Sequence, residues 1–386
     1  MKKYFFYISL FVFLSCNKNS EIVTRDLIDI QDKTNETVIV SPNSVQIADN
    51  EGFFGIYSAA SQWSPCKINT SNTRRIKSGT FVRLLTDDEK SQIGDSISFR
   101  IELHAAFDEW DRNANSWYIK VPKSTTMLSD INVDNYIKTP LIIYTTPYFL
   151  HNTNPNTITY KRDISLFAED LRDKDYDVYI IYDVDANTQR FYGSTDSKDY
   201  CDYPGFRADI FIDTFDKGEI KDKKTKVYVP LISRGIKPTE EITTINFTLK
   251  EDIEDVIIWY TSSGHGAGNA EEGITRQHVL SVDSKEIANF SSKVICTPYE
   301  YYDFINPWGY KGPNATWRYP TRNWCQGGEI IPRLINAGNL KAGIHTFKID
   351  VNKLNEKGGY TYGTNMPIEP GNSLITNAVL IGNKTK

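Results

Sequence analysis

The chain has 386 residues, of which 44 are Lys or Arg and 49 are Asp or Glu, so its formal net charge is −5. A weakly acidic chain lacks the basic surface that nucleic-acid-binding proteins usually present. Hydrophobic residues make up 40% of the chain and charged residues 24%, which is typical of a folded globular protein and excludes an intrinsically disordered one. The length predicts about two domains, each large enough to bury its own core.

The N-terminal residues have the features of an export signal. Lys2 and Lys3 precede an apolar run over residues 4–14, which is too short for a permanent membrane-spanning helix. The run ends in Ser15-Cys16, and a small residue before a lone Cys resembles a bacterial lipobox. This resemblance implies removal of residues 1–15 as a lipoprotein signal peptide and lipidation of Cys16. A plain secretory signal with an incidental Cys is the alternative.

Both interpretations of the N-terminus predict export. With the lipobox in use, the protein is expected to be a cell-envelope lipoprotein, attached through its lipid to the outer membrane or the cell surface. Without it, the protein is expected to be secreted. Residues 16–45 are mostly polar and are interpreted as a tether.

The cysteine and histidine residues also bear on the compartment and on metal binding. The four further cysteines are Cys66, Cys201, Cys296 and Cys325, which are widely spaced and contain no CxxC pair. This pattern favours disulfides in an oxidising compartment over a zinc site. None of the five histidines stands within four residues of another, so the sequence has no local histidine metal motif, and we expect no metal or other cofactor.

Short strand-like segments dominate the exported chain. Apolar and polar residues alternate over residues 97–103, 245–249 and 347–351, which is typical of strands with one buried face. Continuous apolar runs, which suit strands buried on both faces, occupy residues 140–144, 178–182, 256–260 and 378–381.

Helical signals are few: the one short candidate covers residues 164–171. The charged, Gly-containing stretch at 216–225 is the predicted domain boundary. We therefore expect an all-β protein of two side-by-side antiparallel β-sandwich (jelly-roll) domains, residues 46–216 and 217–386.

The densest chemical motif covers residues 107–115, directly after a predicted strand. Asp108, Glu109 and Asp111 surround Trp110, and Arg112 follows. A carboxylate beside an aromatic ring can have a raised pKa, and a neighbouring Arg can hold it ionised. Trp is also a stacking surface for sugar rings. The alternative is a solvated acidic turn anchored by one Trp.

Two later motifs are candidates for a ligand site. Residues 262–272 form a Gly-rich loop after a buried strand, where the backbone can approach a ligand and His265 and Glu272 can face it. Residues 317–325 combine aromatic side chains with two arginines, a combination that can bind sugars or carboxylates. The alternatives are a hairpin connection and a loop held by Trp burial and a disulfide. His278 is interpreted as a packing residue.

Together and in this order, the three motifs resemble the bacterial peptide-N-glycosidase F family, two-domain amidases that release N-glycans from asparagine. Residues 109–115 (EWDRNAN) are similar to the most characteristic segment of that family. The resemblance implies that Asp111 is the primary catalytic aspartate, with Trp110 and Arg112 beside the chitobiose core of the glycan.

The second motif extends the resemblance. Residues 264–278 are similar to the Gly-His loop and the Glu-x-x-x-Arg-x-His strand of the family. This implies that Glu272 is the second essential carboxylate and that His265 binds substrate.

The third motif adds an arginine, a tryptophan and a disulfide. Arg322 and Trp324-Cys325 resemble the Arg and Trp-Cys of the family, although Gln326 replaces the following proline. The resemblance implies that Arg322 and Trp324 are substrate-binding residues of the active site and that Cys296 pairs with Cys325.

The family also carries an active-site glutamate on a strand of the first domain. The corresponding segment here is residues 181–185, where no Glu aligns and Asp183, one methylene shorter, is the nearest candidate for substrate binding. The tryptophan near that glutamate is missing as well.

The resemblance implies a hydrolase that cleaves the amide bond between the core N-acetylglucosamine and the Asn side chain. Its substrates would be N-glycoproteins and N-glycopeptides, and the enzyme is expected to act as a monomer. Asp111 would carry out the principal acid/base work and Glu272 would position water, while Arg322 and Arg112 would stabilise negative charge.

Three alternatives come from other classes. A non-catalytic glycan-binding surface lipoprotein of the same fold would bind glycopeptides without turnover. A glycosidase could use Asp111 and Glu272 on the glycosidic bond instead. A copper monooxygenase would need clustered His and Met ligands, which five scattered His and three Met do not provide.

Overall fold

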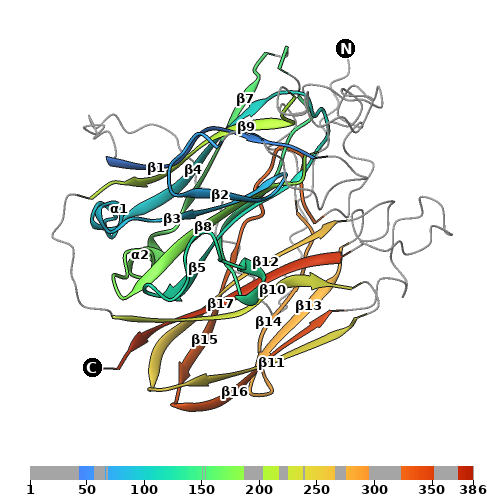
Figure 1. Cartoon of the computed structure of the whole chain (residues 1–386). Helices are drawn as coiled ribbons and strands as arrows, with labels where there is room; N and C mark the ends of the chain where they lie inside the picture. Colours follow the sequence, from blue (N-terminus) through green and yellow to red (C-terminus); the bar gives the residue numbers. More distant parts are fainter. Residues whose placement is uncertain are drawn as a thin grey trace, which may run out of the picture. The chain divides into compact units, whose positions relative to one another are not determined.

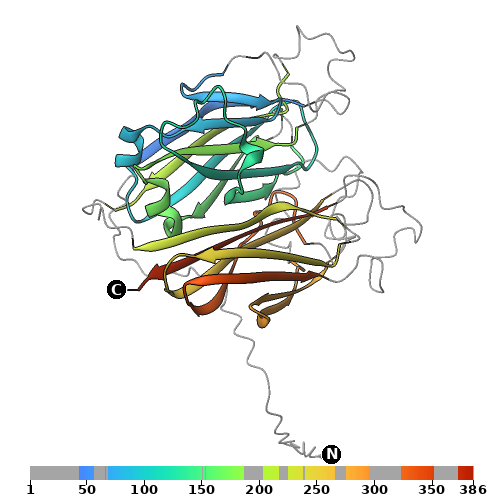
Figure 2. The same cartoon turned by 60° about the horizontal axis from the view of Figure 1, so that its bottom comes forward.

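The computed structural model describes residues 43–55, 66, 68–149, 151–152, 154–186, 203–216, 225–237, 240–265, 275–294, 323–351 and 373–385. Residues 41–386 form one compact unit. The described residues make up four antiparallel sheets (Figures 1 and 2).

The strands before residue 215 build two of these sheets. One has the strand order β1-β9-β4-β7 and the other the order β2-β3-β8-β5-β6. Their bounds are β1 Asn43–Phe53, β2 Thr73–Lys77, β3 Thr80–Leu84, β4 Ile97–Ala105, β5 Asn113–Pro122, β6 Thr139–Thr145, β7 Thr157–Asp163, β8 Tyr176–Val184 and β9 Phe206–Thr214. Side chains from both sheets share one apolar core, so the pair forms a sandwich.

The strands after residue 225 build the other two sheets. Their strand orders are β10-β17-β12-β15 and β11-β16-β13-β14, and they share a second core. Their bounds are β10 Lys226–Ile236, β11 Ile242–Leu249, β12 Ile253–His265, β13 Gln277–Val282, β14 Lys285–Ser291, β15 Arg333–Leu340, β16 Gly343–Val351 and β17 Ser373–Lys384. The predicted boundary at 216–225 falls between β9 and β10.

The strand predictions are confirmed. In β4 and β16, buried residues alternate with half-buried ones, as the alternating sequence pattern requires. Every residue of β6 is buried, and all but the first two residues and Asp183 are buried in β8. These two strands face the sandwich core on one side. On the other side they are covered by two smaller apolar clusters.

The described helices are short. They are α1 Asp87–Ser91, α2 Ala168–Leu171 and the 3-10 turns η2 Val133–Asn135 and η3 Ser165–Phe167. Two of these elements, η3 and α2, lie in the segment at 164–171, where the sequence predicts a short helix. No helix of the described residues is long and apolar enough to cross a membrane.

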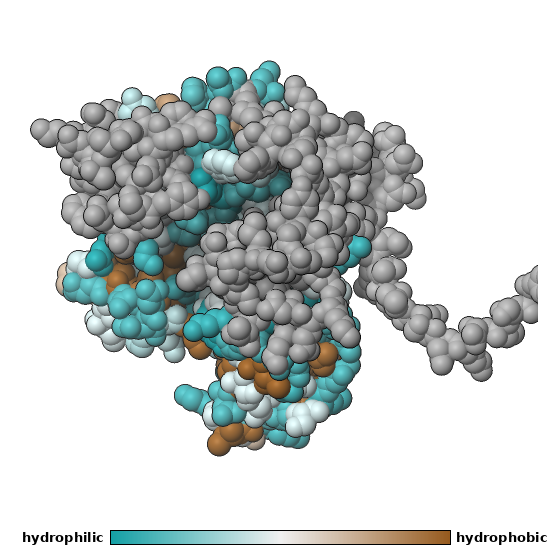
Figure 3. Space-filling view, turned by 90° about the vertical axis from the view of Figure 1, so that its right-hand side faces the viewer, coloured by the Kyte–Doolittle hydropathy of each residue, from teal (hydrophilic) through white to brown (hydrophobic). Residues whose placement is uncertain are grey.

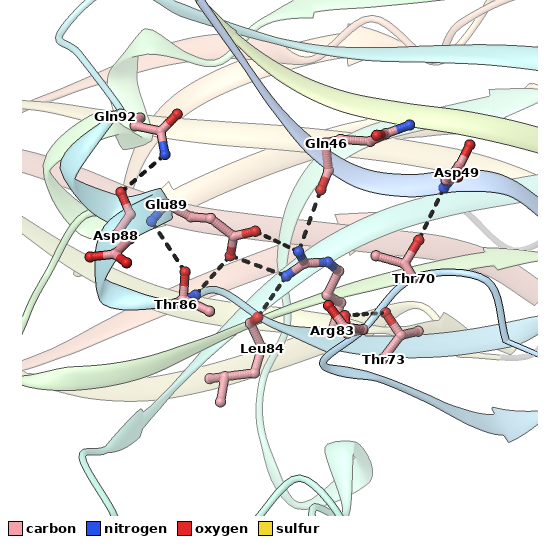
Figure 4. Close-up of polar contacts among 11 residues, drawn as sticks. Gln46, Asp49, Thr70, Thr73, Arg83, Leu84, Thr86, Asp88, Glu89 and Gln92 are labelled. Atoms are coloured by element: carbon pink, nitrogen blue, oxygen red, sulfur yellow. Dashed lines mark hydrogen bonds and ion pairs between the residues drawn. The ribbon is translucent and has the colours of Figure 1, made fainter.

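A capping box fixes the start of α1. The Thr86 hydroxyl accepts the Glu89 N–H at 3.2 Å, and the Glu89 carboxylate accepts the Thr86 N–H at 2.8 Å (Figure 4). Arg83 of β3 binds the same carboxylate and also donates to the Gln46 carbonyl of β1 at 3.4 Å. This arrangement joins the two sheets of the first sandwich.

The two sandwiches share direct contacts. Trp259 and Val379 lie in the sheet β10-β17-β12-β15, and their side chains belong to the core of the first sandwich. The Trp259 ring meets Phe167 edge-on at 5.0 Å. The Trp117 indole N–H donates to the Asn377 side chain at 3.3 Å. The sheet β2-β3-β8-β5-β6 of the first sandwich therefore faces the sheet β10-β17-β12-β15 of the second. On the described part of the surface in Figure 3, hydrophilic and apolar residues are interspersed, as on most folded proteins.

Candidate active site

The turn that carries Asp111 is organised by a buried carboxylate. Asp108, which is 1% exposed, accepts the Trp110 backbone N–H at 3.1 Å. It also accepts two hydrogen bonds from the Arg112 guanidinium, at 2.6 and 3.0 Å. Two parallel N–H···O bonds fix the orientation of a guanidinium more firmly than one. The turn is therefore held by the buried Asp108, and Asp111 is half-buried.

A second lock ties this turn to the end of β6. The fully buried Thr146 hydroxyl donates to the Trp110 carbonyl at 2.9 Å and accepts the Arg112 N–H at 2.7 Å. The Thr146 N–H donates to the Arg112 carbonyl at 2.8 Å. Nearby, the Trp110 and Tyr148 rings meet edge-on at 6.2 Å. The backbone on both sides of Asp111 is thus fixed.

Asp183 lies on the strand next to this turn. It is directly opposite Asn115 of β5 and Thr80 of β3, and the Thr80 hydroxyl donates a hydrogen bond to its carboxylate. Burial of the carboxyl group raises the pKa of Asp183 to about 6, and the Thr80 hydrogen bond opposes the rise. Two residues on, burial raises the pKa of Asp185, while the charge of Arg112 lowers it. The positive charge of Arg112, in the Asp111 turn, therefore acts on the carboxylate at this end of β8.

His265 and Trp324 form a second cluster of candidate site residues. Their rings stack with centroids 5.8 Å apart and an interplanar angle of 18°. The Trp324 indole N–H donates to the Gly264 carbonyl at 2.8 Å, and the Gly264 N–H donates to the Asn323 side chain at 2.9 Å. The Ser263 hydroxyl lies 2.6 Å from Nε2 of His265. The end of β12 and the segment at 323–324 are thus joined by backbone and side-chain bonds.

The segment after Trp324 connects this cluster to the first sandwich. Gly328 accepts the Thr145 N–H at 3.0 Å, and the Ile330 N–H donates to the Ile143 carbonyl at 2.8 Å. Trp324, Ile143 and Ile330 also form one buried apolar cluster. Thr145, which binds Gly328, precedes Thr146, which binds Arg112, so the structure brings the Trp324 motif to the strand end that holds the Asp111 turn.

The remaining predicted site residues lie outside the described residues. These are Glu272, Arg322, Cys296 and Cys16. Cys66 and Cys325 are each disulfide-bonded. Because Cys201 and Cys296 are not described, the pairing of Cys296 with Cys325 stays a prediction.

His278 is a packing residue, as the sequence suggested. It is fully buried, its ring stacks on Phe290 at 5.1 Å, and its Nδ1 lies 2.9 Å from the Tyr260 hydroxyl. Burial, together with the charges of Arg276 and Arg333, lowers its pKa to about 3, so the ring is neutral at neutral pH.

The sequence interpretation missed the positioning role of two residues. In the sequence, Asp108 is one of three acidic residues of the motif, and no pattern marks Thr146. The spacing of Asp108 and Arg112 by four residues was a usable signal, whereas the contact between Thr146 and Arg112 depends on strand pairing. Among the described residues, no group of three or more His, Cys, Asp and Glu side chains is placed to hold a metal ion.

Comparison with known proteins identifies related folds. A family model described as peptide-N-glycosidase F, C terminal, matches residues 236–366. No curated protein sequence matches significantly. The solved structure of PNGF-II matches with a TM-score of 0.62 at 16% sequence identity, covering 89% of this chain and 66% of PNGF-II. The present chain therefore spans just under two thirds of the length of PNGF-II.

Two further structures match over nearly their whole length. PNGase F, described as a glycosylasparaginase from Flavobacterium meningosepticum, has a TM-score of 0.52 and 15% identity, with 89% of this chain and 97% of PNGase F covered. A structure described as peptide-N(4)-(N-acetyl-β-D-glucosaminyl) asparagine amidase has a TM-score of 0.53 and 15% identity, with the same coverage.

The four antiparallel sheets and these matches place the chain in the class of two-domain β-sandwich proteins, which confirms the expected fold class. Within that class, residues 236–366 match the family model of the C-terminal part of peptide-N-glycosidase F, and this match bears out the resemblance seen in the sequence.

Proposed function

We propose that the protein hydrolyses the amide bond that joins the core N-acetylglucosamine to the Asn side chain of N-glycoproteins and N-glycopeptides. The observation that carries the proposal is the attachment of the Trp324 segment to β6, beside the turn of Asp111. Motifs that are far apart in the chain thereby meet at one strand end. A crevice that receives both a sugar and a peptide needs side chains from several elements.

The reaction breaks one C–N bond and consumes one water molecule. Water oxygen attacks the side-chain carbonyl carbon of the glycosylated Asn, and the amide nitrogen leaves with the sugar after it gains a proton. The peptide keeps Asp in place of Asn, and the released glycosylamine sheds ammonia in solution. Such a step needs an acid/base group and a positive charge near the developing oxyanion.

Two described residues have side chains suited to these roles. Asp111 is half-buried on a turn that Asp108 and Thr146 hold, so its carboxyl group can exchange protons with a bound substrate. Arg112 is oriented by the two hydrogen bonds that its guanidinium donates to Asp108, and it supplies positive charge. Glu272 as the water-positioning carboxylate and Arg322 as the second cation remain predictions from the sequence.

We further propose that the protein acts outside the cytoplasm as a monomeric lipoprotein. Support comes from the Lys2-Lys3 apolar run before Cys16 and from the disulfide-bonded state of Cys66 and Cys325.

The test is incubation of the purified chain with a defined N-glycopeptide, followed by mass analysis of both products. We expect an intact glycan and a peptide about one dalton heavier than its Asn form, which indicates amidase chemistry. Asp111→Asn should lower the rate by about 10²-fold or more, whereas Asp130→Asn, at an exposed Asp of the same sandwich, should not. Near-native turnover by Asp111→Asn would contradict the assignment.

A second candidate function is glycan binding without catalysis. It is favoured by the lack of a Glu that aligns with the active-site glutamate of the family, for which the shorter Asp183 is the nearest candidate. Saturable binding of the glycopeptide with no product at long incubation would select this candidate over the amidase.

A further inference from the structure

A short segment from the second half of the chain covers one side of the first sandwich. β6 and β7 are the outermost strands of the two sheets of that sandwich, and an edge strand has backbone groups without a partner in its own sheet. Residues 328–330 run antiparallel to β6 and form two backbone hydrogen bonds with it, and Glu329 lies directly opposite Tyr144. We call residues 328–330 the strap.

The side chain of Glu329 joins the strap to the other sheet. One carboxylate oxygen accepts the backbone N–H of Lys161 in β7 at 3.0 Å, and the other accepts a hydrogen bond from the Arg162 guanidinium. The Glu329 side chain is only 15% exposed and that of Arg162 18%, so little water competes for this pair. A carboxylate has an acceptor oxygen for each donor, whereas an amide has one acceptor for both. The position is therefore matched to a Glu.

Two tyrosines support the same junction. The rings of Tyr144 in β6 and Tyr160 in β7 lie with their centroids 4.1 Å apart. The Tyr160 hydroxyl donates to the Thr145 carbonyl at 3.0 Å, and the Thr145 N–H donates to the strap. Thr145 thus bonds to β7 on one side and to the strap on the other. The strap, β6 and β7 come from three separate parts of the chain and form one bonded unit.

The strap connects two parts of the candidate active site. It begins four residues after Trp324, whose ring stacks on His265. Its bond to Thr145 lies directly before Thr146, which fixes the backbone of the Asp111 turn. Displacement of the strap would therefore move Trp324 and His265 relative to Asp111.

We propose that Glu329 is a positioning residue, which holds the strap against both edge strands and so sets the placement of Trp324 relative to the Asp111 turn. The effect on substrate rests on the proposed function, in which one glycopeptide contacts both places. The strap and its bonds do not depend on that function.

The test compares KM with kcat for a defined N-glycopeptide and the full exported chain. Glu329→Gln should raise KM about 3- to 10-fold and change kcat less than about 2-fold, because it displaces binding groups and keeps Asp111. A residue that only stabilised the fold would act through the folded fraction, so its loss would lower kcat and leave KM unchanged. The split between KM and kcat therefore separates the two roles.

Arg162→Gln removes the other partner of the same ion pair. It should raise KM to a similar extent as Glu329→Gln. In the double variant the two effects should not add, because each single substitution already removes the one interaction that the pair makes.

Glu89→Gln is the matched control. The Glu89 carboxylate also accepts a backbone N–H, from Thr86, and a guanidinium, from Arg83. It lies in the same sandwich, before the start of β4, whereas the Asp111 turn follows the end of that strand, about 27 Å further on. Glu89→Gln should lower the stability of the fold and leave KM unchanged.

Hydrogen exchange gives a readout that needs no turnover. The backbone N–H groups of Thr145 and Ile330 form the two hydrogen bonds between β6 and the strap. In Glu329→Gln these two amides should exchange several-fold faster than in the wild type, because the strap has lost its bond to the other sheet. The amides of the interior strand β4 should exchange as in the wild type.

Three results would overturn the inference: wild-type KM in both single variants, additive effects in the double variant, and unchanged exchange at Thr145 and Ile330. Failure of the proposed function gives a different pattern, in which the wild type does not turn over the glycopeptide while Glu329→Gln still speeds exchange at both amides. Calorimetric affinity for the glycopeptide then takes the place of KM, and a wild type that does not bind, or an affinity indifferent to Glu329, rejects the positioning role. Turnover with a KM indifferent to Glu329 would leave the function standing and reject that role alone.

Discussion

Trp324 packs against Ile143 in a buried cluster that joins a strand of the first sandwich to a segment from the second half of the chain. The same segment continues the second sheet through the bond from Ile330 to the Ile143 carbonyl. Because β6 is followed directly by Thr146, which holds the backbone of Arg112, packing at Trp324 and the geometry of the Asp111 turn are mechanically linked.

Substitution of Trp324 tests this link. Trp324→Phe removes the indole N–H bond to Gly264 and should cost about 1 kcal/mol of unfolding free energy, whereas Trp324→Ala should cost about 3–5 kcal/mol. Both should weaken glycopeptide binding, because the stack with His265 loses its anchor. Urea unfolding and substrate titration measure the two effects. Trp259→Phe, in the core of the first sandwich, should lower stability without changing the affinity for the glycopeptide. If Trp259→Phe weakened binding as much as the Trp324 variants do, the link between Trp324 and the Asp111 turn would be rejected.

The pair of Asp108 and Arg112 is expected to matter far more than a surface pair. Asp108→Asn leaves the guanidinium without its buried counter-charge, a change that typically costs about 3–5 kcal/mol. The control is the pair of the exposed Asp134 and the half-buried Lys138, and Asp134→Asn should cost less than about 1 kcal/mol. Urea unfolding at neutral pH compares the two. Similar small losses in both variants would mean that Asp108 does not organise the turn.

The pKa of Asp183 predicts a pH-dependent stability. Its folded-state value of about 6 lies above the ordinary value of 3.8, so ionisation of Asp183 destabilises the folded state as pH rises through about 4 to 6. Asp183→Asn should therefore stabilise the protein at pH 7, by at most about 3 kcal/mol, and should change stability little near pH 3.5. Thermal unfolding across this range measures the difference. A difference that is the same at both pH values would contradict the assignment.

His278 should act in the opposite direction. Its folded-state pKa of about 3 lies below the ordinary 6.5, so the folded state binds fewer protons than the unfolded chain. The stability that it contributes is complete above pH 6.5 and is lost as pH falls toward 3. His278→Phe, which can keep the stack on Phe290, should flatten the acid-side loss of stability in a pH series of unfolding experiments. An unchanged acid limb would show that other groups cause it.

Local patterns in the sequence were enough to predict the strands and to find the candidate motifs. The alternation in residues 97–103 and 347–351 follows directly from the period of a strand with one buried face, and β4 and β16 lie there. The apolar context of His278 correctly predicted packing. Asp183 was found only through the family resemblance, and its raised pKa follows from burial, which no local pattern encodes.

The contacts that bring the separate motifs of the candidate site together are long-range. Thr146 meets Arg112, and Gly328 meets Thr145, only because strands distant in the chain pair in a particular register. The position of Asp183 beside the Asp111 turn likewise depends on Asn115 lying opposite it. A shift of one residue in that register would turn every one of these side chains to the other face, and the sequence alone does not reveal the register.

The most direct test of the proposed chemistry is turnover of a defined N-glycopeptide in water enriched in the heavy oxygen isotope. The proposal predicts that the former glycosylated Asn becomes an Asp that carries one labelled oxygen, and that Asp111→Asn nearly abolishes this product. A peptide that retains an unlabelled Asn or Asn-linked sugar, with the isotope found only in the released glycan, would contradict amide hydrolysis at this site.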